Sequence, residues 1–451
     1  MKRIVTLLSI IAILFTNNQF VYAEEDGTVI VESECAIPEE PEINGHAAIL
    51  IDIDTGAILY SKNANEKMYP ASITKIMTGL LAVENCAMED TFIFTQDILN
   101  VLPWDAAKYG YVAGEEVNIR DLLYVLMLRS ANEVAIGLGM KIAGTEEEFA
   151  KLMTERAKEI GAVNTNFANA TGLHDDNHYT TAYDMALIAM EAMENATFAE
   201  VWGTPNYIVN PTNIEVDVVR IWNRHNMMVN TNAAYYSYAK GGKTGYTDEA
   251  GRTLVTYASR DGRNLMCVVM KSGTDTVYAD TRLLFEYGFN EFENISVKGN
   301  ESRFGQSGDS YFISREDMFG ESTNLMELVD GYVTVPKGVS LDKVGYKLTY
   351  LLGREDELIA TIEYMIGEKY LGSTSLKINV SKNEEGDASP YQPVEEEDIK
   401  KQEELAINIY VVAGIVSGMI VLIIVIKIVR KTSGKRKAKK ARKKLFNNKL
   451  H

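Results

Sequence analysis

The pattern of apolar and polar residues predicts strands near both ends of a long helical region. Ala47–Asp52 is an apolar run, and a turn of Asp, Thr and Gly separates it from Ala57–Tyr60, so these two segments are predicted to form a hairpin. A second hairpin is predicted from Leu254–Tyr257 and Leu265–Met270, because the Arg-Asp-Gly-Arg sequence between them favours a tight turn.

Between these hairpins the apolar residues recur at helical spacing. Ser72–Val83 is predicted to be one buried helix, and Leu122–Met140 is predicted to be a second, longer one. Strands at both ends of a helical middle are typical of an α+β domain in which the terminal strands share one antiparallel sheet. We place this main domain at residues 44–292, after a linker over 24–43.

The pattern changes again after the main domain. Short alternating segments, such as Tyr332–Pro336 and Lys347–Leu351, predict a small all-β domain over residues 293–380. Residues 381–404 are rich in Glu, Asp and Pro and are predicted to be a solvated acidic stalk.

The first residues predict a secretory signal. Lys2 and Arg3 precede an apolar stretch over residues 4–15, and a small-residue cleavage site ends at Ala23. The alternative is a membrane anchor, but the apolar stretch is shorter than the roughly 20 residues that a helix needs to cross a bilayer. We therefore predict a signal peptide over residues 1–23.

The C-terminal part predicts a membrane span. Residues 405–426 contain no charged side chain, and at about 1.5 Å per residue they cover the hydrocarbon core of a bilayer. Residues 427–451 are rich in Lys and Arg and contain no acid, so the positive-inside bias predicts a cytoplasmic tail and an extracytoplasmic main domain. A buried core helix is the alternative, but a folded domain gains nothing from so many like charges beside it. A single-pass protein of the cell membrane, with lipid around the span, is the prediction.

Charge and cysteine content exclude several classes. The formal net charge is −18 despite the basic tail, so the exported part is strongly acidic and a nucleic-acid function is not expected. The three cysteines, Cys35, Cys86 and Cys267, show no CxxC pair and no regular spacing, which does not indicate a disulfide framework. The oligomeric state is left open.

A first chemical signal is the segment Pro70–Lys75. Proline favours a helix start, and Ser72 and Lys75 are three residues apart, so a helix places them on one face. A serine hydroxyl needs a base to become a nucleophile, and a lysine can act as one if burial or another cation lowers its pKa. Taken alone, the SxxK spacing occurs by chance in many long proteins and is more often a capping serine with a surface lysine.

Two further signals follow along the chain. Ser130 and Asn132 interrupt an apolar run, where buried polar groups need hydrogen-bond partners or have a functional role. The alternative is a serine and an asparagine in the core whose hydrogen bonds are all satisfied within the fold. Lys243-Thr244-Gly245 follows two other glycines, which permit a ligand to approach the backbone. The cation and hydroxyl suit a substrate carboxylate, and the alternative is a glycine-rich turn with exposed lysines.

The five histidines are candidates for metal ligands or for a catalytic base. His174 and His178 bracket Asp175 and Asp176, but the spacing matches no zinc motif, and we predict neither a metal site nor a cofactor. The remaining histidines are isolated in the sequence and give no support for a histidine-based triad: His46, His225 and His451.

The order SxxK, SxN, KTG is much more specific than any of its parts. The chain resembles the low-molecular-mass penicillin-binding proteins, the serine D-alanyl-D-alanine carboxypeptidases. Asn169–Leu173, His178–Asp184 and Lys243–Gly251 also look like sequence blocks of this family. The resemblance implies a catalytic domain like that of β-lactamases and penicillin-binding proteins, an antiparallel sheet with a helical subdomain, followed by the small all-β domain and one C-terminal transmembrane helix. Ala131 departs from the family, which more often has glycine there.

The resemblance also implies a role for each motif residue. Ser72 would attack the carbonyl between two D-alanines, Lys75 would take its proton, and Ser130 would relay a proton to the leaving amine. The remaining residues would bind the substrate and the oxyanion: Asn132, Lys243, Thr244, Gly245 and Tyr246.

The function implied is removal of the terminal D-alanine from peptidoglycan stem peptides through an acyl-enzyme on Ser72, with β-lactam antibiotics as inhibitors. A D,D-endopeptidase or a β-lactamase would use the same residues. A catalytically idle protein that binds wall peptides is an alternative of a different class, and the presence of all three motifs argues against it.

Overall fold

The computed structural model describes residues 21–23, 28–304, 326–351 and 358–378. Most of the predicted signal peptide lies outside these residues, as do the predicted stalk, span and tail. No helix among the described residues has the length and apolar character needed to cross a membrane. All the described residues belong to one compact unit.

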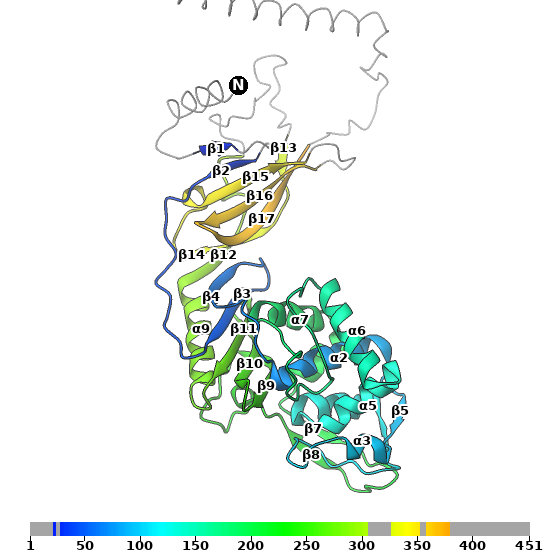
Figure 1. The fold of residues 1–451 in the computed structure, drawn as a ribbon. Helices are drawn as coiled ribbons and strands as arrows, with labels where there is room; N and C mark the ends of the chain where they lie inside the picture. The colour runs from blue at the N-terminus through cyan, green and yellow to red at the C-terminus, as the bar shows by residue number, and fades with distance from the viewer. Residues whose placement is uncertain (1–20, 24–27, 305–325, 352–357, 379–451) are drawn as a thin grey trace, which may run out of the picture. The chain divides into compact units, whose positions relative to one another are not determined.

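The main domain is built on a five-stranded antiparallel sheet in which the first and last strands of the domain lie side by side (Figure 1). Both predicted hairpins are present, and the central pairing joins the first hairpin to the second. In sheet order the strands are β4 (Ile58–Lys62), β3 (Ala47–Asp52), β11 (Arg263–Ser272), β10 (Gly251–Arg260) and β9 (Ala239–Thr247). The predicted α+β arrangement is confirmed.

The turn between β10 and β11 fixes the register of the second hairpin. Arg260 pairs with Arg263, so Asp261 and Gly262 form a two-residue loop. Both have positive φ, 53° and 83°, which is the conformation of a type I′ turn and matches the twist of the flanking strands.

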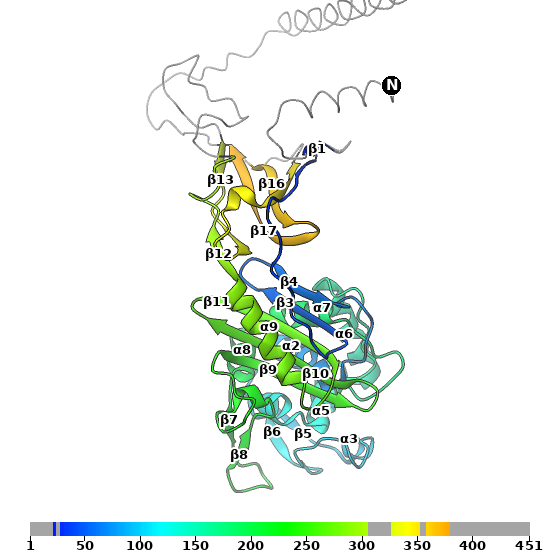
Figure 2. The same ribbon diagram turned by 90° about the vertical axis from the view of Figure 1, so that its left-hand side faces the viewer.

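Helices cover both faces of this sheet (Figures 1 and 2). On one face, Leu50 and Cys267 pack with Phe285 of α9 (Val277–Glu291), so Cys267 is a buried core residue. On the other face, alternate residues of the same strands, such as Ile49 and Val268, pack against the larger helical layer. Because successive side chains of a strand point to opposite faces of the sheet, the same strands contribute to two separate hydrophobic cores.

The helical layer includes α2 (Lys75–Asn85), α7 and α8, joined by shorter elements. Thr181 caps α7, because its side chain accepts a hydrogen bond from the Asp184 N–H. Helices α7 and α8 span Ala182–Glu194 and Ala196–Trp202, and α4 and α5 are described below. Other elements of this layer are α3 (Gln96–Asn100), α6 (Glu146–Glu159), and the strand pairs β5 (Thr91–Ile93) with β6 (Glu116–Asn118) and β7 (Asn206–Val209) with β8 (Val219–Trp222).

The prediction of one continuous helix over 122–140 is wrong. The chain forms α4 (Ile119–Tyr124) and a π-helical turn over Val125–Arg129, stops at Ser130, and resumes as α5 (Asn132–Ala143). Ser130 has φ 60° and ψ 35°, a left-handed conformation that ends a right-handed helix. The apolar period continues on both sides because both helices are buried, so the pattern carries no sign of the break.

The described part of residues 293–380 consists of strands and one 3₁₀ turn. A six-stranded sheet has the order β1 (Val21–Ala23), β2 (Val29–Val31), β15 (Gly345–Tyr350), β16 (Leu358–Ile366), β17 (Lys369–Ile378) and β13 (Met326–Leu328), and β12 (Phe292–Ser296) pairs separately with β14 (Tyr332–Pro336). Sequence reasoning missed β1 and β2, which lie in the segments taken as signal and linker, because a strand of three residues gives no periodic pattern.

Candidate active site

Ser72 and Lys75 lie at the junction of two helical segments. A 3₁₀ turn over Ala71–Thr74 leads directly into α2, and Lys75 Nζ lies 3.1 Å from Ser72 Oγ. Ala71 is buried and has a φ of 51°, a backbone conformation that costs free energy in a residue other than glycine and is often found at active sites. The spacing of three residues therefore brings the hydroxyl and the amine together, as predicted.

Lys75 is fully buried and is surrounded by oxygen atoms. Besides Ser72, its Nζ donates to Asn132 Oδ1 at 2.7 Å and to the carbonyl oxygen of Thr171. Burial lowers the pKa of Lys75 well below its usual value, and the nearby Lys243 cation lowers it further. The neutral amine has two N–H donors and one lone pair, so the two acceptors can take the donors and leave the lone pair for the Ser72 hydroxyl.

The Thr171 carbonyl reaches Lys75 from a loop that the side chain of Asn169 holds. Asn169 Oδ1 accepts hydrogen bonds from the N–H groups of Thr171 and Gly172, at 3.1 and 2.8 Å. A Cβ atom on Gly172 would lie 1.9 Å from the Ala71 carbonyl oxygen, so only glycine permits this contact. The sequence indicated this block only through its resemblance to a family, and gave no sign of its contact with Lys75.

The break after the π-helical turn exposes Ser130 to the same site. Ser130 Oγ accepts a hydrogen bond from Lys243 Nζ at 3.0 Å. Two residues later, at the start of α5, Asn132 points its amide oxygen at Lys75, while its backbone N–H donates to Ala107 O. The SxN motif thus places one residue beside each of the two lysines.

Strand β9 contributes the third motif along its edge. Lys243 is buried and also donates to the Thr244 carbonyl at 2.8 Å; burial, with a contribution from Arg224, lowers its pKa to about 7. A Cβ atom on Gly245 would lie 2.8 Å from the Ser72 backbone nitrogen, so glycine lets the strand approach the nucleophile closely. Tyr246 is half exposed, at 52%.

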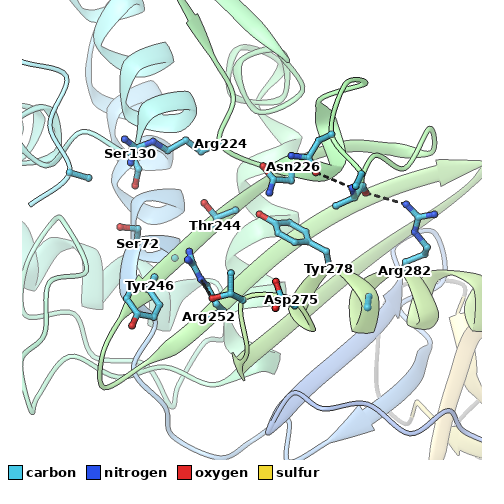
Figure 3. Close-up of a pocket in the computed structure, with 17 residues that line it drawn as sticks. Ser72, Ser130, Arg224, Asn226, Thr244, Tyr246, Arg252, Asp275, Tyr278 and Arg282 are labelled. Atoms are coloured by element: carbon cyan, nitrogen blue, oxygen red, sulfur yellow. Dashed lines mark hydrogen bonds between the residues drawn. The ribbon is translucent and has the colours of Figure 1, made fainter.

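These motif residues surround a cavity of about 830 Å³ (Figure 3). Lys75, Asn132 and Lys243 are buried behind its wall, and the other predicted site residues line it: Ser72, Ser130, Thr244, Gly245 and Tyr246. All eight predicted residues therefore meet at one site. The arrangement provides a nucleophile, an amine base and a second amine beside a hydroxyl, which suits acyl transfer.

Arg224 was not predicted from the sequence. It follows β8, lines the cavity, and its guanidinium has no hydrogen-bond or ion-pair partner among the described residues. Burial and the neighbouring Arg129 lower its pKa, but an arginine remains charged. It is an unpaired cation in the site, and no motif surrounds it in the sequence.

His225, which appeared isolated in the sequence, lies directly behind this wall. Its Nε2 is 2.8 Å from Thr256 Oγ1, and a Cβ atom on Gly242 would lie 2.4 Å from its ring. Burial, and next the Lys243 cation, lowers the pKa of His225 to about 3, so the ring is neutral. It packs under β9 and does not line the cavity.

His178, weighed above as a metal ligand, has a structural role. Its Nδ1 accepts a hydrogen bond from the Ala168 N–H, which leaves Nε2–H to donate to Thr74 Oγ1 at 2.8 Å. Burial lowers the pKa of His178 to about 4. Within the described ranges, no group of three or more His, Cys, Asp or Glu side chains is placed to hold a metal ion.

Comparison with known proteins agrees with this geometry. The model of one protein family, described as D-alanyl-D-alanine carboxypeptidase (Peptidase S11), matches residues 34–274. The D-alanyl-D-alanine carboxypeptidase DacF of Bacillus subtilis is 33% identical over 72% of this chain and 83% of its own. DacC of Escherichia coli, with the same description, is 29% identical over 77% of this chain and 86% of its own.

This chain belongs to the Peptidase S11 family. Among solved structures, that of a D-alanyl-D-alanine carboxypeptidase of Mycobacterium tuberculosis is 26% identical, with a TM-score of 0.52, over 58% of this chain and 96% of its own. The Streptomyces K15 DD-transpeptidase is 27% identical, with a TM-score of 0.52, over 56% and 99%. The main domain therefore has the penicillin-binding-protein fold, and the chain is a serine hydrolase, a D-alanyl-D-alanine carboxypeptidase.

Proposed function

We propose that this S11 peptidase removes the terminal D-alanine from peptidoglycan stem peptides through an acyl ester on Ser72. The observation that carries this mechanism is the position of Lys75, whose buried Nζ lies between Ser72 Oγ and two oxygen atoms that can only accept hydrogen bonds. Burial, together with the nearby Lys243 cation, lowers the pKa of Lys75 and favours a neutral amine directed at the nucleophile.

Acylation then uses both amines. Lys75 takes the Ser72 proton as Oγ attacks the carbonyl between the two D-alanines. Ser130, whose Oγ already accepts a hydrogen bond from Lys243, gives a proton to the leaving amine. Water hydrolyses the ester in the second half of the cycle, and a β-lactam would leave a longer-lived ester on the same oxygen.

Substrate recognition is assigned to the cavity wall. Lys243 and Thr244 would hold the terminal carboxylate by charge-assisted hydrogen bonds, and the unpaired Arg224 cation strengthens the attraction for an anion there. Asn132 would bind the peptide backbone of the substrate. The backbone N–H groups of Ser72 and Tyr246 would stabilise the oxyanion, a contribution worth on the order of 10²–10³ in rate.

The direct test is D-alanine release from a pentapeptide ending in D-Ala-D-Ala, measured beside intact-protein mass spectrometry with benzylpenicillin. We expect free D-alanine and a single penicilloyl adduct on the peptide that contains Ser72. Folded protein that gives neither product would exclude the proposed function. Rapid loss of the adduct with penicillin turnover would indicate a β-lactamase instead.

The two lysines predict a bell-shaped pH profile of kcat/KM. Activity should fall as pH drops through the lowered pKa of Lys75, because a protonated amine cannot accept the serine proton. It should also fall as pH rises through about 7, because Lys243 then loses the charge that binds the carboxylate. A matched peptide with a C-terminal amide should lack the alkaline limb. An alkaline limb of equal size for both peptides would contradict this assignment of Lys243.

We also propose that the enzyme works outside the cytoplasm, held in the cell membrane by residues 405–426. Support comes from the signal-like start, the charge-free stretch and the basic residues that follow it. In protoplasts, added protease should remove the catalytic domain and leave an epitope at the C-terminus protected. Protection of the catalytic domain in intact protoplasts would refute this topology.

A further inference from the structure

Glu133, the residue after Asn132, is a buried acid beside the catalytic residues. It lies in the first turn of α5 and exposes only 1% of its surface. Its Oε1 accepts hydrogen bonds from the backbone N–H groups of Tyr109 at 2.7 Å and Gly110 at 2.8 Å. Its Oε2 is also buried and has no hydrogen-bond partner among the described residues. Such an oxygen is an exception among buried polar atoms, and an exception of this kind calls for a functional explanation.

The carboxylate holds one wall of the cavity to the start of α5. The loop that donates its two N–H groups to Glu133 also provides the carbonyl oxygen of Ala107, which accepts the Asn132 N–H at 2.9 Å. Ala107 lines the cavity, and Asn132 Oδ1 accepts a hydrogen bond from Lys75 Nζ. Glu133 therefore anchors both a wall segment and the residue that contacts the base.

The charges around Lys75 come from several elements. Burial is the largest cause of its lowered pKa, and the cations Lys243 on β9 and Arg224 after β8 lower the pKa further, whereas Glu133 on α5 raises it. His178, on the segment before α7, is neutral above about pH 4 because burial lowers its pKa. Of the described charged groups that act on Lys75, Glu133 is the one acid.

Acylation adds a positive charge at this position. As Ser72 Oγ bonds to the substrate carbonyl, its proton moves to the lone pair of Lys75, and the neutral amine becomes an ammonium near two other cations. The environment that keeps the free amine neutral therefore opposes the proton transfer. A fixed carboxylate nearby offsets this opposition, and its effect is strong because a buried site screens charge poorly.

We propose that Glu133 is a positioning residue whose charge stabilises the ammonium form of Lys75 during acylation, while its Oε1 holds the cavity wall. The inference rests on the proposed function, in which Lys75 takes the proton of Ser72. Glu133 acts through Lys75 and does not itself line the cavity. The two oxygens of its carboxylate have different tasks, because Oε1 is bound by backbone N–H groups and Oε2 faces no donor among the described residues.

Glu133→Gln removes the charge and keeps the shape of the side chain. The amide oxygen can still accept from the two backbone N–H groups, so the loop contact remains. In acylation of the full-length protein by benzylpenicillin, the maximal rate should fall about three- to tenfold, because a less basic amine takes the proton less readily. The acidic limb, the fall in rate at low pH, should move to lower pH by about one unit, because Lys75 loses the anion that raises its pKa.

This pair of effects separates an electrostatic role from a structural one. A residue that only braces the loop would change the rate or the thermal unfolding temperature without moving the acidic limb. Glu133→Asp keeps the charge but draws it back by one methylene, so its acidic limb should move in the same direction by a smaller amount. An acidic limb that stays at the native pH in either folded variant would overturn the inference.

Glu115→Gln is the matched control. Glu115 is likewise buried and braces the far end of the same loop, accepting hydrogen bonds from the Val112 N–H at 3.0 Å and from Thr212 Oγ1 at 2.8 Å. It is not among the charges that act on Lys75. Its acylation rate should stay within about twofold of the native rate, with an unmoved acidic limb. A limb displaced as far as in Glu133→Gln would contradict the specific role of Glu133.

The native enzyme distinguishes failure of this inference from failure of the proposed function. Native protein that is not acylated, or is acylated at a rate without an acidic limb, would count against Lys75 as the base and therefore against the proposed mechanism. A native acidic limb that Glu133→Gln leaves in place would overturn the role of Glu133 alone.

Discussion

Replacement of Ser72 by alanine is expected to abolish the penicilloyl adduct and to lower D-alanine release by on the order of 10⁶ in kcat, as for loss of the nucleophile in other serine hydrolases. The expectation follows from geometry, since Ser72 Oγ is the hydroxyl beside Lys75 Nζ and lies at the cavity wall. Ser130 also lies beside an amine in this wall, but the proposed function requires that amine, Lys243, to be charged so that it can hold the carboxylate. Intact-protein mass spectrometry and single-turnover kinetics measure the two effects.

The control for this variant is Ser61→Ala, which removes an exposed hydroxyl from β4 that does not line the cavity. It should form the adduct at the normal rate. Thermal unfolding of Ser72→Ala should remain close to that of the native protein, because the hydroxyl is only half buried. An adduct that persists in folded Ser72→Ala would mean that another residue is the nucleophile.

The sequence predicted those parts of the site that depend on local rules. Three-residue spacing on a helix brings Ser72 to Lys75. The glycines near Lys243 indicate close approach by a ligand, and in the structure the group that approaches Gly245 is the backbone of Ser72. The terminal strands were predictable for the same reason, since each hairpin is set by its own turn. The resemblance to a known family then predicted that the three motifs lie together at one site, which no local pattern in the sequence indicates.

The parts that were missed depend on contacts between distant segments. Ser130 ends a helix inside an apolar run, and the pattern cannot show this because residues on both sides are buried in the same core. Arg224 reaches the cavity only through the position of β8, and β2 becomes a strand only by pairing with β15. For Arg224 and β2, the residues that decide the structure lie more than ninety positions away in the sequence. For Ser130, the left-handed backbone conformation has no signature in the sequence.

Replacement of Lys75 by arginine is expected to slow acylation by benzylpenicillin by on the order of 10²–10⁴, the usual contribution of a general base. A guanidinium stays protonated and has no lone pair, so it cannot take the Ser72 proton. The native side chain is fully buried, and its pKa is lowered by burial and by Lys243, which is the environment of a base and not of an ion-pairing cation. Stopped-flow or quenched-flow acylation rates measure the effect.

The pH dependence distinguishes loss of the base from disturbed packing. Acylation of the native enzyme should fall at low pH as Lys75 becomes protonated, and Lys75→Arg should lose this dependence because its side chain does not titrate in the range. Lys243→Arg is the matched comparison. The proposed role of Lys243 requires a cation that holds the carboxylate, and arginine provides one. The acylation rate should therefore fall less in Lys243→Arg than in Lys75→Arg. A Lys75→Arg enzyme that acylates at the native rate, with the native acidic limb, would show that Lys75 is not the base, and the role would have to pass to Lys243 through Ser130.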